Sequence, residues 1–132
     1  MDSTSIDLAG SRISAVKVDG DEVRVRFEPA YLVKTMTGSV ERTRWWQNGE
    51  LVFSGAQLDA ESALPEFPAD CSGGDVGENV YTYRDMIPVP LESVGHAHCD
   101  LRVGEQAVRI QAQGVTLVLE DVAKYIEHIR PE

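Results

Sequence analysis

Hydrophobic and polar residues alternate along much of the chain. The alternation is clearest at 22–28, where Val23, Val25 and Phe27 are separated by charged residues, and it returns at 108–112 and 115–119. A period of two residues is typical of a strand that has one face in a core and the other in solvent. The pattern therefore predicts a mainly β protein built from antiparallel strands.

Turn-forming residues divide this pattern into hairpins. The residues typical of tight turns occur at Asp19-Gly20, Asn48-Gly49, Gly104-Glu105 and Gly114. Pro29 interrupts the strand after the first turn and predicts a bend or bulge near 28–30. We expect a hairpin meander of about seven or eight strands, which at this length forms an antiparallel β-barrel or a strongly curved β-sandwich.

The hydrophobic period changes near the C-terminus. Val122, Tyr125, Ile126 and Ile129 fall at helical spacing, after an aspartate that is a suitable N-cap. We therefore expect a short C-terminal α-helix at about 121–130 that packs against the sheet. The whole chain, 1–132, is expected to form a single β-rich domain.

The alternation is absent from 57–79, where prolines and glycines are frequent. No Lys or Arg occurs between Arg44 and Arg84, so this segment carries carboxylates without basic neighbours. Loops of such length are uncommon in compact domains and often have a function. We predict a long acidic loop at about 57–79 and assign binding roles to four of its residues: Asp59, Glu61, Glu66 and Asp75.

Two adjacent tryptophans occur in a predicted strand. Neighbouring residues of a strand point to opposite faces, so one of Trp45 and Trp46 must meet solvent, a loop or a partner. A ring covered by a loop is the more common fate of such a residue, and a ligand platform is the alternative. Both tryptophans are therefore included among the candidate binding residues.

The segment His96-Ala97-His98-Cys99-Asp100 has the residue types of a metal site. His96 and His98 would share a strand face at a spacing of about 6.6 Å and could both reach one Zn or Fe ion. Cys99 would point to the other face, so a third ligand would have to come from elsewhere in the chain. The alternative is a solvated polar face opposite the apolar face that contains Ala97 and Cys99. We expect no cofactor, with a Zn or Fe site at His96 and His98 as the alternative.

Charge limits the partners of the protein. Twelve basic and 22 acidic residues give a formal net charge of −10 and a pI near 4.7. Binding to nucleic acid or to an anionic membrane requires a basic surface, so neither is expected. Residues 1–10 lack the basic start and apolar segment of a signal peptide, which favours a cytoplasmic protein with Cys71 and Cys99 as free thiols.

The sequence contains no complete catalytic set, neither a nucleophile elbow nor a phosphate-binding glycine loop. We therefore expect a non-enzymatic binding or interaction module that engages a protein or a small molecule through the acidic loop and the adjacent sheet edge. A homodimer is also expected. The alternative function is a small metal-dependent or cavity-based enzyme centred on His96 and His98.

Several segments also resemble a group of small bacterial β-rich proteins that have no assigned activity. The segments that carry this resemblance are 16–20, 25–31, 46–47, 54–56, 87–91, 110–115 and 125–127. The resemblance implies a compact β-rich fold with a helical C-terminus. It implies no activity and no site residues.

Overall fold

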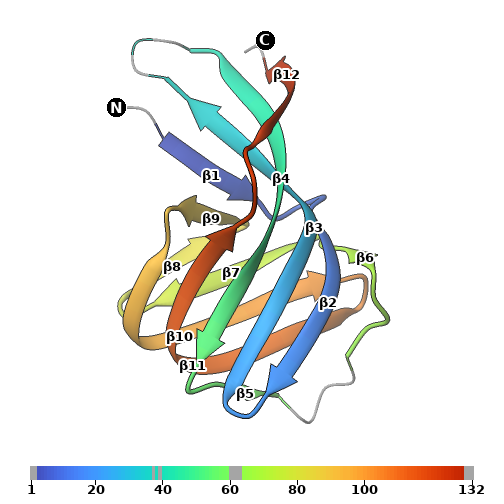
Figure 1. Ribbon diagram of the computed structural model, residues 1–132, viewed down its shortest axis with the longest axis vertical. Helices are drawn as coiled ribbons and strands as arrows, with labels where there is room; N and C mark the ends of the chain where they lie inside the picture. Colours follow the sequence, from blue (N-terminus) through green and yellow to red (C-terminus); the bar gives the residue numbers. More distant parts are fainter. Residues whose placement is uncertain (1–2, 37, 39, 60–63, 130–132) are drawn as a thin grey trace.

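The computed structural model describes residues 3–36, 38, 40–59 and 64–129. Within these residues the chain is mainly β, with twelve strands in one antiparallel sheet and no helix (Figure 1). Eight of the strands follow one another in the order β6-β2-β3-β4-β11-β10-β7-β8. This part of the sheet curls into a half-barrel, which confirms the prediction of a mainly β protein with a curved antiparallel sheet. The predicted hairpin meander is wrong, because β11 and not β5 lies beside β4 in this order.

Five long strands supply most of the sheet. They are β2 (Arg12–Asp19), β3 (Glu22–Thr35), β4 (Arg42–Ser54), β10 (Glu92–Val103) and β11 (Gln106–Leu119). Hydrophobic residues that alternate in the sequence are also the buried ones. Val23, Val25 and Phe27 are at most 1% exposed, whereas the charged residues between them lie on the outer side. Burial of these apolar side chains is the main favourable term in folding.

Seven shorter strands complete the sheet. They are β1 (Ser3–Asp7), β5 (Gln57–Leu58), β6 (Ala69–Asp70), β7 (Gly73–Glu78), β8 (Tyr81–Arg84), β9 (Met86–Val89) and β12 (Lys124–Ile129). Part of the segment predicted as a long loop at 57–79 is therefore strand. The expectation of a loop is wrong at 73–78, because β7 pairs with both β10 and β8 and its glycines allow close contact with β10.

The hairpin of β3 and β4 reaches beyond the curled body. The pairing of these strands shifts register between Phe27 and Ala30, where the sequence predicts a bulge. Beyond this point β3 pairs with β1 instead of β2, and β4 pairs with β12 instead of β11. We call this part the extension: β1, β9, β12, residues 30–35 and residues 42–47. In Figure 1 it lies above the half-barrel, with β9 nearest to β8.

Two of the predicted turns are wrong. The structure confirms the turns at Asp19-Gly20 and Gly104-Glu105, but β4 runs straight through Gly49 and β11 runs straight through Gly114. A Cβ atom on Gly49 would lie 2.7 Å from the carbonyl oxygen of Val118, and one on Gly114 would lie 2.8 Å from Ser54 Oγ. These glycines therefore permit close approach of neighbouring strands rather than a reversal of the chain.

The predicted C-terminal helix at 121–130 is also wrong, because residues 124–129 form β12. Residues 42–46 of β4 have an edge that β11 does not cover, and β12 pairs with this edge through backbone hydrogen bonds. A helix of about ten residues has little stability of its own and depends on burial of its apolar face. The residues at helical spacing are not buried here: Val122 is 75% exposed and Tyr125 50%.

The interior of the half-barrel is filled by side chains. Val25, Phe27, Leu51 and Ile110 have no exposed surface, and Leu117 packs against them. A sheet of this size can hold either side chains or one small ligand, and here it holds side chains. No helix in the described ranges is long and apolar enough to cross a membrane.

Candidate functional site

His96 and His98 lie on the outer face of β10, as the alternation predicts. Their ring centres are 5.7 Å apart, and His98 lies over Gly77 of β7. Ala97 and Cys99 point into the core between and beside them. Within the described ranges, no three His, Cys, Asp or Glu residues come together in a way that could hold a metal ion. The two imidazoles therefore lack a third ligand from this part of the chain, and a stable zinc site needs three or four.

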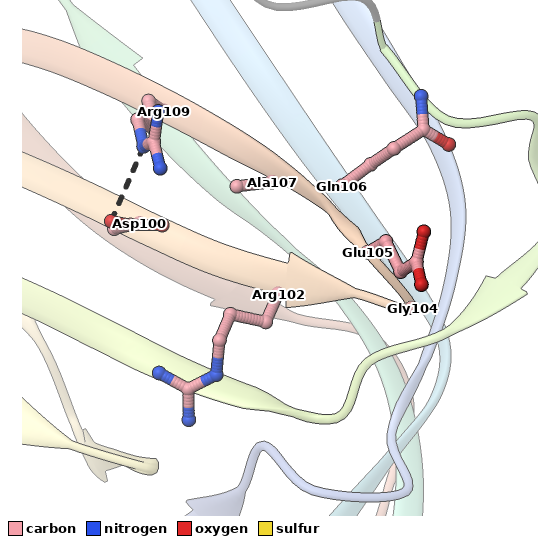
Figure 2. A pocket seen from close by; sticks show the side chains of 7 residues that line it. All are labelled: Asp100, Arg102, Gly104, Glu105, Gln106, Ala107 and Arg109. Carbon is pink, nitrogen blue, oxygen red and sulfur yellow. Dashed lines mark hydrogen bonds and ion pairs between the residues drawn. The ribbon is translucent and has the colours of Figure 1, made fainter.

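A hollow of about 410 Å³ lies farther along the same outer face, at the end of the β10–β11 hairpin (Figure 2). Ala107 leaves space between the side chains of Arg102 and Arg109. Arg109 is bound to Asp100 at 3.4 Å, and Arg102 is bound to Asp85 at 3.2 Å. Both arginines are about half exposed and already paired, which makes this hollow a weak candidate for an anion site.

The acidic residues predicted to bind come from separate elements of the chain. Asp75 lies on β7 beside Arg84, at 3.7 Å, whereas Asp59 follows β5, and its N–H donates to the carbonyl of Arg109 on β11. Strand β10 separates β7 from β11, so Asp59 and Asp75 are roughly 14 Å apart at the usual strand spacing. Glu66 is exposed on another segment, and Glu61 lies outside the described residues. Asp59 and Asp75 are therefore not in contact with each other, and their binding role stays a prediction.

The two tryptophans lie on opposite faces of the extension, as the sequence predicts. Trp45 pairs across the sheet with Leu32 and Tyr125, and Trp46 pairs with Tyr31 and Lys124. Both indoles are half-buried. The extension is thus a sheet with large aromatic rings on both faces, and Trp45 packs against the hydrophobic core.

On the Trp45 face, the ring is held by three neighbours. Lys34 Nζ lies 4.3 Å from its centre, Tyr125 meets it edge to face at 5.3 Å, and its indole N–H donates to Thr43 Oγ1 at 2.8 Å. Tyr125 in turn contacts the ring of His128 at 5.7 Å. These geometries are those of favourable cation–π and aromatic contacts.

On the Trp46 face, Lys124 Nζ lies 4.6 Å from the centre of the indole, and the Arg44 guanidinium lies 5.1 Å from the ring of Tyr31. Tyr31 and Trp46 are cross-strand partners, so their rings are neighbours. Both line a groove of about 460 Å³ whose other lining residues are Glu28, Pro29, Asn48 and Ile126.

Sequence reasoning found the two tryptophans and missed their neighbours. Lys34 comes from β3, the hairpin partner of β4, whereas Lys124 and Tyr125 come from β12, which is far from the tryptophans in the sequence. Only the register shows that all three lie beside Trp45 and Trp46. A regular alternation of polar and apolar residues at 124–129 would have predicted a strand there. The bulge at Ile126 interrupts the alternation, so that the apolar residues fall at helical spacing instead.

Both cysteines are free and buried. Burial raises the pKa of the Cys71 thiol and of the Cys99 thiol, which keeps both protonated and unreactive at neutral pH. They therefore do not supply a nucleophile to any of the surface regions described above.

Comparison of the chain with known proteins gives no guidance on these regions, since no protein-family model, no curated protein and no solved structure matches it. The choice among the histidine face, the hollow of Figure 2, the acidic residues and the extension therefore rests on their geometry alone. Of these regions, the extension brings together aromatic and basic side chains from β3, β4 and β12.

Proposed function

We propose that this chain is a non-enzymatic binding module that contacts a protein partner through the extension. The observation that carries the proposal is a tryptophan with a lysine over its ring on each face: Trp45 with Lys34, and Trp46 with Lys124. Neither lysine forms an ion pair with a residue that the structure describes. Each is a positive charge beside an aromatic surface, with no ion-pair partner among the described carboxylates.

The composition of the extension supports a protein partner. It contains both tryptophans of the chain and two of its four tyrosines, together with Arg44. Trp, Tyr and Arg are the residues that most often contribute strongly to the binding energy of protein interfaces. Two rings on opposite faces of one sheet do not close around one small molecule, whereas a protein can contact either face.

Charge supports a partner that presents carboxylates. The described residues of the extension and of the turn at its tip carry four cations and three carboxylates: Lys34, Arg42, Arg44 and Lys124 against Asp7, Glu41 and Glu127. The rest of this strongly acidic chain would repel such a partner. Attraction at the extension combined with repulsion elsewhere would orient the encounter.

The test is a comparison of proteins retained by the immobilised chain and identified by mass spectrometry. Trp46→Ala is the test variant, and Tyr81→Ala is the matched control because Tyr81 is a 63% exposed aromatic residue on β8, outside the extension. We expect a partner that the wild type and the control retain and that Trp46→Ala loses. Equal retention by all three proteins would show that the extension is not the binding surface.

A metal-dependent enzyme at His96 and His98 is the second candidate, and the closeness of the two rings is the observation that favours it. Elemental analysis of the untagged protein, purified with added zinc or iron at neutral pH, separates the two proposals. A binding module is expected to carry less than about one-tenth of a metal per chain. A stoichiometric metal that is lost in His96→Ala and His98→Ala would favour the enzyme.

A further inference from the structure

Strand β12 is paired along one edge only. Residues 124–129 pair with β4, and no other described strand pairs with β12. The backbone N–H and C=O groups that point away from β4 are therefore available to another strand. Five of the six residues of β12 are exposed, including Tyr125 at 50% and Ile126 at 39%.

The register of β12 contains one extra residue. Tyr125 pairs with Trp45, and Glu127 pairs with the next residue of β4, Arg44, so Ile126 forms a bulge. In a regular strand, Lys124 and Glu127 would lie on opposite faces, because they are three residues apart. The bulge places both on the face of Trp46. Lys124 and Glu127 thus flank Tyr125 along the free edge of β12. Both point to the face of Trp46, whereas Tyr125 points to the face of Trp45.

This arrangement is complementary to itself. We infer that β12 pairs antiparallel with β12 of a second copy of this chain, about a two-fold axis at Tyr125. In this register, Lys124 lies opposite Glu127 of the partner subunit, and Glu127 lies opposite the partner's Lys124. The central pair is Tyr125 with Tyr125 of the partner subunit, on the face of Trp45. The two extensions then form one continuous sheet.

The charges of the two edge residues favour this partner. Neither Lys124 nor Glu127 has an ion pair with a described residue of its own chain, so each is available for the other copy. Opposite charges at directly opposed positions of antiparallel strands are stabilising, and like charges are destabilising. Two copies with a net charge of −10 repel each other. Repulsion is weakest at the extension, where four described cations face three described carboxylates.

The inference rests on the proposed function because it names a partner for the extension, a second copy of the chain. A strand from a different protein is the other occupant that this edge could accept, by β-strand addition. Self-complementarity distinguishes the two, because only pairing of two identical edges requires that Lys124 and Glu127 satisfy each other.

A charge exchange tests the inference. The dimer dissociation constant of the full chain would be measured by sedimentation equilibrium for the wild type, Lys124→Glu, Glu127→Lys and the double variant. Lys124→Glu places two carboxylates opposite each other at both ends of the contact, and Glu127→Lys places two ammonium groups there. We expect each single variant to weaken dimerisation by about tenfold or more and the double variant to restore it to within about threefold.

Lys17→Glu on β2 and Glu105→Lys in the β10–β11 turn are matched controls, because they make the same changes far from β12 and are expected to leave the dimer unchanged. Near-ultraviolet circular dichroism confirms that each variant is folded. A wild type that stays monomeric at hundreds of micromolar, or a double variant as weak as the single ones, overturns the inference. If the wild type is monomeric but retains a different protein that Trp46→Ala does not retain, the inference of a dimer is overturned. The proposed function then remains in place.

Discussion

Trp45 and Trp46 are adjacent in the sequence, but only Trp45 packs against the hydrophobic core. Trp46 lies on the other face of β4, beneath Lys124 and beside the groove at Pro29. One residue of this pair therefore has a structural role that the other lacks. This difference separates stability from binding in the extension and leads to the first prediction.

Trp45→Ala is expected to destabilise the protein more than Trp46→Ala. Loss of the Trp45 ring removes contacts with the core and with Tyr125, which should lower the free energy of unfolding by about 2 kcal/mol. Trp46→Ala should lower it by about 1 kcal/mol or less, because the cation–π contact with Lys124 is its main attachment. Urea unfolding followed by circular dichroism measures both. Equal losses, or a larger loss for Trp46→Ala, would contradict the assignment.

Gly49→Ala is expected to destabilise the protein by about 2 kcal/mol, because the added methyl group overlaps the backbone of Val118 and the side chain of Leu119 in β11. Gly104→Ala is a useful control: its Cβ meets no atom within 4 Å, and its cost of about 1 kcal/mol comes from a positive φ alone. Both are measured by urea unfolding. If Gly49→Ala costs less than Gly104→Ala, β11 does not approach β4 as closely as described.

Arg26 is expected to control part of the acid sensitivity of the fold. It donates hydrogen bonds to Glu28 and Glu120, and these bonds are the main reason that the pKa values of both carboxyl groups lie below 4.5. A pKa that is lower in the folded state stabilises the protein fully above the unfolded value, and this stabilisation is lost as the pH falls through the folded value.

The free energy of unfolding should therefore fall between about pH 5 and pH 2 in the wild type and fall less steeply in Arg26→Gln. Urea unfolding at a series of pH values gives the two slopes. Arg84→Gln is the control, because Arg84 is 82% exposed and far from this ion pair network. Equal pH dependence in the wild type and Arg26→Gln would refute the assignment.

Cys71 and Cys99 are expected to resist thiol reagents in the folded protein. Both are buried, and burial raises the pKa of both thiols, so little thiolate is present or accessible at pH 8. Reaction with an aromatic disulfide reagent should be at least about a hundredfold slower in buffer than in strong denaturant, where both thiols react. A fast native reaction at either residue would mean that the core opens readily around it.

Alternation predicted the strands of the half-barrel well, because burial on one face leaves a direct trace in the sequence. Val23, Val25 and Phe27 are all core residues, and His96 and His98 lie outside while Cys99 lies inside. The bulge after Phe27 was signalled by Pro29 in the same way. The burial of a side chain and the bulge at a proline each depend on the residues of a single strand, so the sequence of that strand is enough to predict them.

The errors concern relations between strands. Gly49 and Gly114 resemble turn residues, but their role is to admit a neighbouring strand, which a single sequence does not reveal. Residues 121–130 resemble a helix because the bulge at Ile126 mimics a helical spacing. For the same reason the sequence did not reveal that Asp59 and Asp75 are separated by two strands, or that lysines lie beside Trp45 and Trp46.

Strand β4 belongs to both parts of the molecule. It pairs with β3 along almost its whole length, while its other edge is covered first by β12 and then by β11. The extension and the half-barrel therefore share two continuous strands, β3 and β4, and we expect the opening of one part to disturb the other. A partner bound at the extension would accordingly slow hydrogen exchange in the half-barrel as well. Binding at one end of the molecule would thus stabilise the other end against local unfolding.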